Sequence, residues 1–180
     1  MSIKIRDEAF KYYFYFIQER MKIFWKRYNG QIQDLTNDKI IRNHKFTNVY
    51  RAQDRVSQYL IKNVIYNQGQ FNEVDTLLRI LVFKVFNNID TWKFIENEYG
   101  ELTAGNFNVD RLTLLLSKRI STTPIFSPAY MMTGSHSKYT CYRSKHEKWL
   151  RMIEKELLRD GVFVKITKAK SLSEVYNLLE

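Results

Sequence analysis

The sequence predicts an all-α fold, a single compact multi-helix domain over residues 1–180. Two observations lead to this prediction. Apolar residues recur at the 3.6-residue spacing of helices through most of the chain, and capping residues or glycines separate one such segment from the next. A chain of 180 residues, 44% of them hydrophobic, is also long enough to bury a core.

The first predicted helix covers residues 7–28, and its expected buried side is rich in aromatic residues. The residues on that side are Phe10, Tyr13, Phe14, Ile17, Met21 and Phe24. Asn29-Gly30 then predicts a left-handed helix stop. Thr36 is expected to cap a short second helix, with Asp38 in its first turn.

Residues 47–66 contain neither Gly nor Pro and predict one long helix with Thr47 as its N-cap. One face has the spacing of a core: Val49, Ala52, Val56, Leu60 and Val64. A second face combines cations and amides without an acid: Asn48, Arg51, Arg55, Gln58 and Lys62. Asp54 sits between these faces and could pair with Arg51 or Gln58. The second face could follow a phosphate backbone or be a solvated flank, and the pattern leaves both open.

Residues 71–86 predict another helix. Its apolar residues are nearly continuous in the second half, so it should be the central helix of the domain: Leu77, Leu78, Leu81, Val82, Val85 and Phe86. Arg79 and Lys84 are its interior charges, and each must reach the surface, a carboxylate or a ligand. Asp90 is expected to cap the helix that follows.

Further helices are predicted at residues 91–98, 109–120 and 145–159. Residues 162–166 alternate apolar and polar side chains, which indicates a short strand or extended piece. A capping box at residues 171–174 should open a last helix.

Residues 121–142 change composition toward Pro, Gly, Ser, Thr and Tyr, and predict one long irregular loop. A short turn is expected at residues 128–132. Long loops inside compact domains are often functional. This one holds His136 and Lys138, and Arg143 follows it, so we treat the two cations as candidate ligand-binding residues.

The chain has 29 basic and 19 acidic residues, a net charge of +10, and this balance favours an anionic partner such as nucleic acid. The lone Cys141 excludes an intrachain disulfide and fits a reducing compartment. The sequence shows neither a signal-peptide core nor an apolar run of membrane-spanning length. We therefore expect a cytoplasmic protein without a membrane partner.

Residues 100–107 have the two-glycine spacing of a phosphate loop, but Asn106 and Phe107 occupy the positions of the essential Lys and Ser/Thr. A helix stop followed by a loop is the better interpretation. The three histidines and one cysteine lack metal-ligand spacing. No cofactor is expected in this chain itself.

Tyrosines interleave with the cations: Tyr50, Tyr59, Tyr66, Tyr130, Tyr139 and Tyr142. Cations bind phosphate without reading sequence, whereas aromatic rings can stack on an unpaired base. The same tyrosines could equally be packing residues with a solvated hydroxyl. Nucleic-acid binding requires at least two of them to be exposed beside Arg51, Arg55, Lys138 or Arg143.

The segments FTNVYRAQDRV (46–56), LRILVFKVFN (78–87) and TW (91–92) resemble the helical domain of phage 5-hydroxymethyl-deoxyuridine DNA kinases. That domain is related to the alpha-glutamyl/putrescinyl thymine pyrophosphorylases. PAYMM (128–132) and SLSEVY (171–176) look like later segments of the same family.

The resemblance implies a helical, DNA-glycosylase-like domain in the pathway that hypermodifies thymine in viral DNA. There, 5-hydroxymethyluracil in DNA is phosphorylated, and an amine or amino acid then displaces the activated group. Chemistry on a base requires the base to leave the stack. Asp54 is the candidate catalytic residue. The candidate nucleic-acid-binding residues are Asn48, Arg51, Arg55, Arg79, Lys84, Lys138 and Arg143.

The expected partners are DNA and a kinase domain or second subunit. Because this chain lacks a phosphate loop, a nucleotide phosphate donor would bind to that partner. The family continues past the final helix, so the chain could be a short relative, half of a split transferase, or a truncated piece. The alternative is a non-catalytic phage protein that uses the same scaffold to bind nucleic acid or inhibit a partner.

Overall fold

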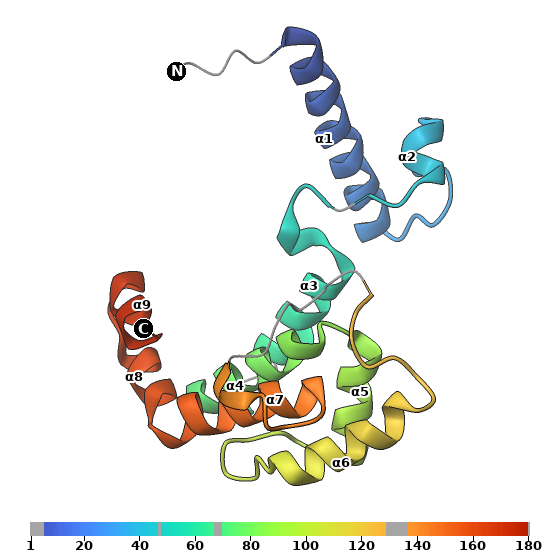
Figure 1. Cartoon of the computed structure of the whole chain (residues 1–180). Helices are drawn as coiled ribbons and strands as arrows, with labels where there is room; N and C mark the ends of the chain where they lie inside the picture. The colour runs from blue at the N-terminus through green and yellow to red at the C-terminus, as the bar shows by residue number, and fades with distance from the viewer. Residues whose placement is uncertain (1–5, 47, 67–69, 129–136, 180) are drawn as a thin grey trace. The chain divides into compact units, whose positions relative to one another are not determined.

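The computed structural model describes residues 6–46, 48–66, 70–128 and 137–179, and these ranges contain helices and no β-strand. The all-α prediction is confirmed. The chain forms two compact units, Met1–Gln58 and Tyr59–Glu180, which we call the N-terminal and C-terminal units. Each is described by itself (Figure 1).

The N-terminal unit is built on α1 (Asp7–Tyr28), which has the predicted bounds and ends before Gly30 at φ +85°. The loop that follows is tied back to α1. The Thr36 hydroxyl donates to the Glu19 carboxylate at 2.9 Å, and the Lys26 ammonium donates to the Asp34 carbonyl at 2.8 Å. These contacts hold the loop against the second half of α1.

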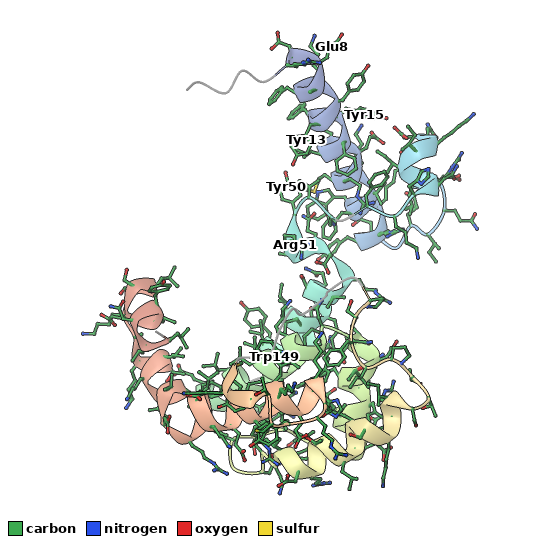
Figure 2. The ribbon with its side chains drawn as sticks, viewed as in Figure 1. Glu8, Tyr13, Tyr15, Tyr50, Arg51 and Trp149 are labelled. Carbon is green, nitrogen blue, oxygen red and sulfur yellow. The ribbon has the colours of Figure 1, made fainter. Side chains whose placement is uncertain are left out.

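The predicted buried side of α1 is wrong in its first half. Phe10, Tyr13 and Phe14 are each more than half exposed, and Figure 2 shows Tyr13 projecting from the helix. The Tyr15 hydroxyl donates to the Asp38 carboxylate at 3.1 Å, and Phe16 meets Phe46. The turns around Glu19–Lys26 contact the loop, so the support of α1 begins after its first two turns. Ile23, in the second half, is buried.

The second helix, α2 (Lys39–Asn43), is capped by Asp38 and not by the predicted Thr36, so it starts two residues later than predicted. Asp38 is its N-cap, and its carboxylate accepts from the backbone N–H groups of Ile40 at 2.8 Å and Ile41 at 3.0 Å. Thr36 is buried and engaged with Glu19. A short carboxylate satisfies two open donors of the helix start, which explains why Asp38 takes the cap.

The single helix predicted over residues 47–66 is wrong. The chain forms a 3-10 turn η1 (Arg51–Gln53), a short α3 (Arg55–Tyr59) and a π-helix η2 (Leu60–Ile65). Asp54 separates the first two with an extended backbone, φ −72° and ψ 156°. The proposed cap Thr47 lies outside the described residues. Arg51 and Arg55 therefore do not share one continuous helical face.

The core of the C-terminal unit surrounds α4 (Glu73–Phe86), which contacts η2, α5 (Ile89–Glu98), α7 (Lys145–Met152) and α8 (Val162–Lys168). Its role as the central helix is thereby confirmed. Asn72 caps α4. The buried apolar residues of α4 are Leu78, Val82, Phe83, Val85 and Phe86.

One predicted detail of the neighbouring helices differs. Asn88, rather than Asp90, caps α5, because its side-chain oxygen accepts from the Asp90 and Thr91 N–H groups. In contrast, α6 (Val109–Ile120) has the predicted bounds. Ser144 caps α7 by accepting from the Glu147 N–H. Helix α6 packs on α7 in this unit (Figure 1).

The predicted strand at residues 162–166 is wrong, because α8 (Val162–Lys168) occupies this position. Gly161, at φ +68°, ends the π-helix η4 (Ile153–Arg159) and starts α8, which buries Phe163 against its neighbours. The capping box is present in modified form at α9 (Leu172–Leu179). Ser171 accepts from the Glu174 N–H, while Glu174 accepts from the Lys170 N–H.

The irregular loop at residues 121–142 is confirmed where the structure describes it. Its first part is anchored, because the Ser127 N–H donates to the Phe86 carbonyl at 2.9 Å and the Thr91 hydroxyl donates to the Ile125 carbonyl at 2.8 Å. Its last part contains the 3-10 turn η3 (Ser137–Tyr139). Most of the predicted 128–132 turn, and His136, lie outside the described residues.

Candidate nucleic-acid interface

The segment of residues 48–55 carries four of the predicted site residues on three local motifs. The Asn48 side chain accepts from the Tyr50 N–H at 3.3 Å, which forms a small turn. Arg51 opens η1, Asp54 ends it, and Arg55 opens α3. The Gln53 amide reaches the Met21 sulfur at 3.6 Å and thereby ties the segment to α1.

Asp54 is the N-cap of α3. Its carboxylate accepts from the N–H groups of Val56 at 2.8 Å and Ser57 at 3.0 Å, and from the Ser57 hydroxyl at 3.0 Å. These bonds satisfy the open donors of the helix start. The structure thus gives the carboxylate a structural role, and its catalytic role stays a prediction.

Arg51 and Arg55 are both exposed, so neither guanidinium is enclosed by the protein. Tyr50, directly before Arg51, is 44% exposed, and Figure 2 shows the two side by side along the chain. This segment therefore offers two cations and one aromatic ring to solvent. That combination can contact a phosphate backbone and an unpaired base.

Arg79 has a different environment, because it is 1% exposed in the C-terminal unit. Its guanidinium pairs with Glu96 at 3.0 Å and lies 4.1 Å from the ring centroid of Phe71 and 5.0 Å from that of Trp92. The sequence analysis predicted that this charge would reach the surface, a carboxylate or a ligand, and in the structure it reaches the carboxylate of Glu96. A buried, paired arginine is not placed to contact DNA, and we omit Arg79 from the interface.

The other predicted cations of the C-terminal unit are exposed at separate elements. Lys84, near the end of α4, donates to the Asn87 side chain at 3.0 Å. Lys138, in η3, forms an ion pair with Glu156 at 3.2 Å. Arg143 is exposed just before α7. Each remains a candidate ligand of an anion.

The tyrosines divide into packed and exposed ones. Tyr139 is buried, and its hydroxyl donates to Glu156 at 2.7 Å. Burial and this carboxylate raise the pKa of Tyr139 to about 12. Tyr142 stacks on Tyr139, and Tyr59 stacks on Phe83. Tyr50 and Tyr66 are the exposed members in the described part of the set. Tyr50 directly precedes Arg51, whereas no contact in the described ranges places Tyr66 beside one of the four cations, so the structure supplies one of the two tyrosines that the sequence analysis required.

A basic pocket that the sequence did not reveal lies between α1, α2 and the adjoining loops. We call it the α1–α2 pocket, and its volume is about 460 Å³. Its charged lining comprises Arg20, Arg27, Arg42, Lys45 and one acid, Asp34. The rest of the lining is apolar, aromatic or polar: Ile23, Ile32, Leu35, Thr36, Ile41, His44 and Phe46.

Arg20 is the most enclosed cation of the α1–α2 pocket. One of its terminal nitrogens donates to the Phe46 carbonyl at 3.3 Å, and its buried Nε lacks a hydrogen-bond partner among the described atoms. Burial, and then the nearby positive charge of Arg27, lower the pKa of Arg20. The sequence indicates only that Arg20 and Arg27, two helical turns apart, share one side of α1; it does not indicate that α2 and the loops close a pocket over them.

The described ranges offer neither a metal site nor a membrane span. Their His, Cys, Asp and Glu side chains form no group of three or more that could hold a metal ion. Their helices also include none that is both long and apolar enough to cross a bilayer.

The fold and the surface define an all-helical protein with basic, partly aromatic sites on its N-terminal unit. Residues 7–180 match the model of the family described as "5-hmdU DNA kinase, helical domain", so the chain belongs to that family. The resemblance found in the sequence is thereby confirmed. No curated protein and no solved structure gave a significant match.

Proposed function

We propose that this chain is a DNA-binding component of a viral thymine-hypermodification system that acts on 5-hydroxymethyluracil in DNA. Its membership in the helical-domain family of a 5-hmdU DNA kinase supports this assignment. In the proposal, a kinase domain or second subunit binds the nucleotide phosphate donor and works on the DNA that this chain holds.

The main support for DNA binding is the charge of the N-terminal unit. Its 58 residues include twelve Lys or Arg and six Asp or Glu, a net charge of +6, whereas the 122 residues of the C-terminal unit carry +4. Exposed Arg51 and Arg55 belong to the N-terminal unit. Each lysine or arginine that neutralises a phosphate releases a counterion, which makes the affinity depend on salt.

The 48–55 segment gives this proposal a local mechanism. Arg51 and Arg55 contact backbone phosphates, and Tyr50 stacks on a base that has left the helix. Asp54 is a positioning residue, because its cap fixes the chain between the two arginines. Asn48 holds the turn before Tyr50 through its hydrogen bond.

A salt titration of DNA affinity tests the proposal. The double variant Arg51→Gln/Arg55→Gln should bind duplex DNA more weakly, and its slope of log K against log salt should be about 1–2 units shallower than that of the wild type. The matched control Lys118→Gln/Lys165→Gln removes two exposed cations of the C-terminal unit. Equal slopes for the two double variants would contradict the assignment to the N-terminal unit.

A turnover assay separates the base-modifying role from the alternative of a pure binding or inhibiting protein. DNA that contains 5-hydroxymethyluracil is incubated with a phosphate donor and the chain, with and without a separately expressed kinase domain of the family. The proposal predicts that the chain increases phosphate transfer to the DNA. Binding without any increase, or inhibition of the kinase domain, would favour the alternative.

A further inference from the structure

The α1–α2 pocket gathers positive charge from separate parts of the N-terminal unit. Arg20 and Arg27 come from α1, Arg42 comes from α2, and Lys45 comes from the chain that follows α2. Asp34 is the single carboxylate in the lining. Four cations that converge on a concave site with one acid create a strongly positive potential there.

We propose that the α1–α2 pocket binds a phosphate group of a nucleotide, with Arg20, Arg27 and Arg42 as its ligands. This inference deepens the proposed function, on which its biological role rests. It assigns a defined phosphate site to the N-terminal unit in addition to the exposed arginines of the 48–55 segment.

The state of Arg20 supports a phosphate ligand. Its guanidinium is held in place by the Phe46 carbonyl, and its buried Nε has no hydrogen-bond partner among the described atoms. A planar guanidinium fixed in this way suits the oxygens of a phosphate group. Burial, and then the repulsion from Arg27, lower the pKa of Arg20, and a bound anion would reduce that repulsion.

The remaining lining fits the rest of a nucleotide. Phe46 is 38% exposed, and its ring is held edge-on by Phe16 at 5.3 Å and by His44 at 6.4 Å between ring centroids. An aromatic ring fixed in this way can stack on a base. The volume of about 460 Å³ falls within the roughly 300–1,000 Å³ of typical small-ligand sites.

The phosphate could come from two sources with the same chemistry. One is a phosphodiester of the DNA backbone. The other is a phosphate monoester carried on a modified pyrimidine of the same DNA. Both place two or more anionic or polar oxygens against the arginines, and the experiment below distinguishes them.

The first measurement is a calorimetric titration with thymidine 5′-monophosphate at low salt. The variant Arg27→Gln/Arg42→Gln removes two exposed lining cations, so we expect it to fold. Its affinity should fall at least tenfold. The control Lys11→Gln/Lys39→Gln removes two exposed cations of the same helices that do not line the pocket, and its affinity should stay within twofold. Equal affinities in the two variants, or a wild type that does not bind, would overturn the inference.

The second measurement compares two DNA duplexes, one unmodified and one with a single 5-phosphomethyluracil. If the pocket binds backbone phosphate, Arg27→Gln/Arg42→Gln weakens both complexes equally. If it binds the monoester, the variant removes a preference of the wild type for the modified duplex. Failure of the inference is distinguishable from failure of the proposed function. If only the pocket inference fails, Arg27→Gln/Arg42→Gln binds both duplexes like the control Lys11→Gln/Lys39→Gln, while Arg51→Gln/Arg55→Gln still lowers the salt slope.

Discussion

The two units of the molecule use their aromatic and basic residues in opposite ways. In the C-terminal unit, Phe83, Phe86 and Trp92 are each about 1% exposed and form a core. In the N-terminal unit, Ile23 and Ile41 are the buried apolar side chains of the described part, while many of its aromatic rings are exposed. The exposed rings of α1 are Phe10, Tyr12, Tyr13, Phe14, Tyr15, Trp25 and Tyr28.

Arg79 differs in the same way from Arg51 and Arg55. Arg79 is enclosed by two rings and paired with Glu96, so its charge contributes to the interior of the C-terminal unit. Arg51 and Arg55 are exposed in the N-terminal unit. Residue type alone therefore does not identify a ligand-binding cation. The environment that the fold supplies does.

The largest expected effect comes from the core of the C-terminal unit. Phe83→Ala removes a ring that stacks on Tyr59 and meets Trp92 edge to face, and should lower the free energy of unfolding by about 3–5 kcal/mol. Denaturant titration measures this change. Tyr13→Ala, at a ring 58% exposed in the N-terminal unit, should change it by less than about 0.5 kcal/mol. Similar losses for both would remove the contrast between the units.

The next effect concerns the ion pair between buried Arg79 and partly exposed Glu96. Glu96→Gln leaves the Arg79 charge without its carboxylate and should cost about 2–4 kcal/mol of stability. Arg79→Met removes the charge along with the pair and should cost less. Both variants should keep the DNA affinity of the wild type under conditions where they are folded. A selective loss of DNA affinity in Arg79→Met would show that this arginine contacts DNA after all.

A smaller effect is expected at the cap of α3. Asp54→Ala removes three hydrogen bonds at the helix start and should lower stability by about 1 kcal/mol. Asp54→Asn keeps a capping oxygen and should cost only a fraction of this. If Asp54 were a catalytic base, Asp54→Asn would instead abolish phosphate transfer in the turnover assay while stability stayed near that of the wild type.

The smallest effect is a pH dependence in the C-terminal unit. Burial lowers the pKa of His146 below its usual 6.5, and its ring nitrogen lies 3.1 Å from the Ser117 hydroxyl. The unfolded chain therefore takes up a proton first as the pH falls. The stability contributed by His146 is complete above pH 6.5 and is lost as the pH falls below it.

The variant His146→Gln isolates this contribution. The difference in unfolding free energy between wild type and variant should shrink as the pH is lowered from 7.5 to 5, as measured by denaturant titration. A difference that stays constant over this range would contradict the inferred shift.

The periodicity of apolar residues predicted helix bounds well where no internal capping residue interrupts the helical repeat. The bounds of α1 and α6 agree with the sequence analysis because glycine or capping signals enclose a single helical repeat. Over residues 47–66 the repeat was equally clear, yet Asp54 caps its own helix and interrupts the pattern. A short polar side chain can thus override periodicity through local hydrogen bonds.

The remaining differences come from tertiary packing. The alternation at residues 162–166 indicated a strand, but α8 buries Phe163 in a helical unit. The α1–α2 pocket joins residues from two helices and a loop, a proximity that one-dimensional spacing does not contain. The glycosylase-like topology stays a prediction, since no solved structure matches.

The most direct test of the central claim is hydrogen–deuterium exchange of the whole chain with and without duplex DNA that contains 5-hydroxymethyluracil. We expect DNA binding to slow the exchange of backbone amides in residues 20–58, which hold the α1–α2 pocket and the 48–55 segment, and to change it little in α4–α6. Protection confined to the C-terminal unit, with residues 20–58 unaffected, would contradict it.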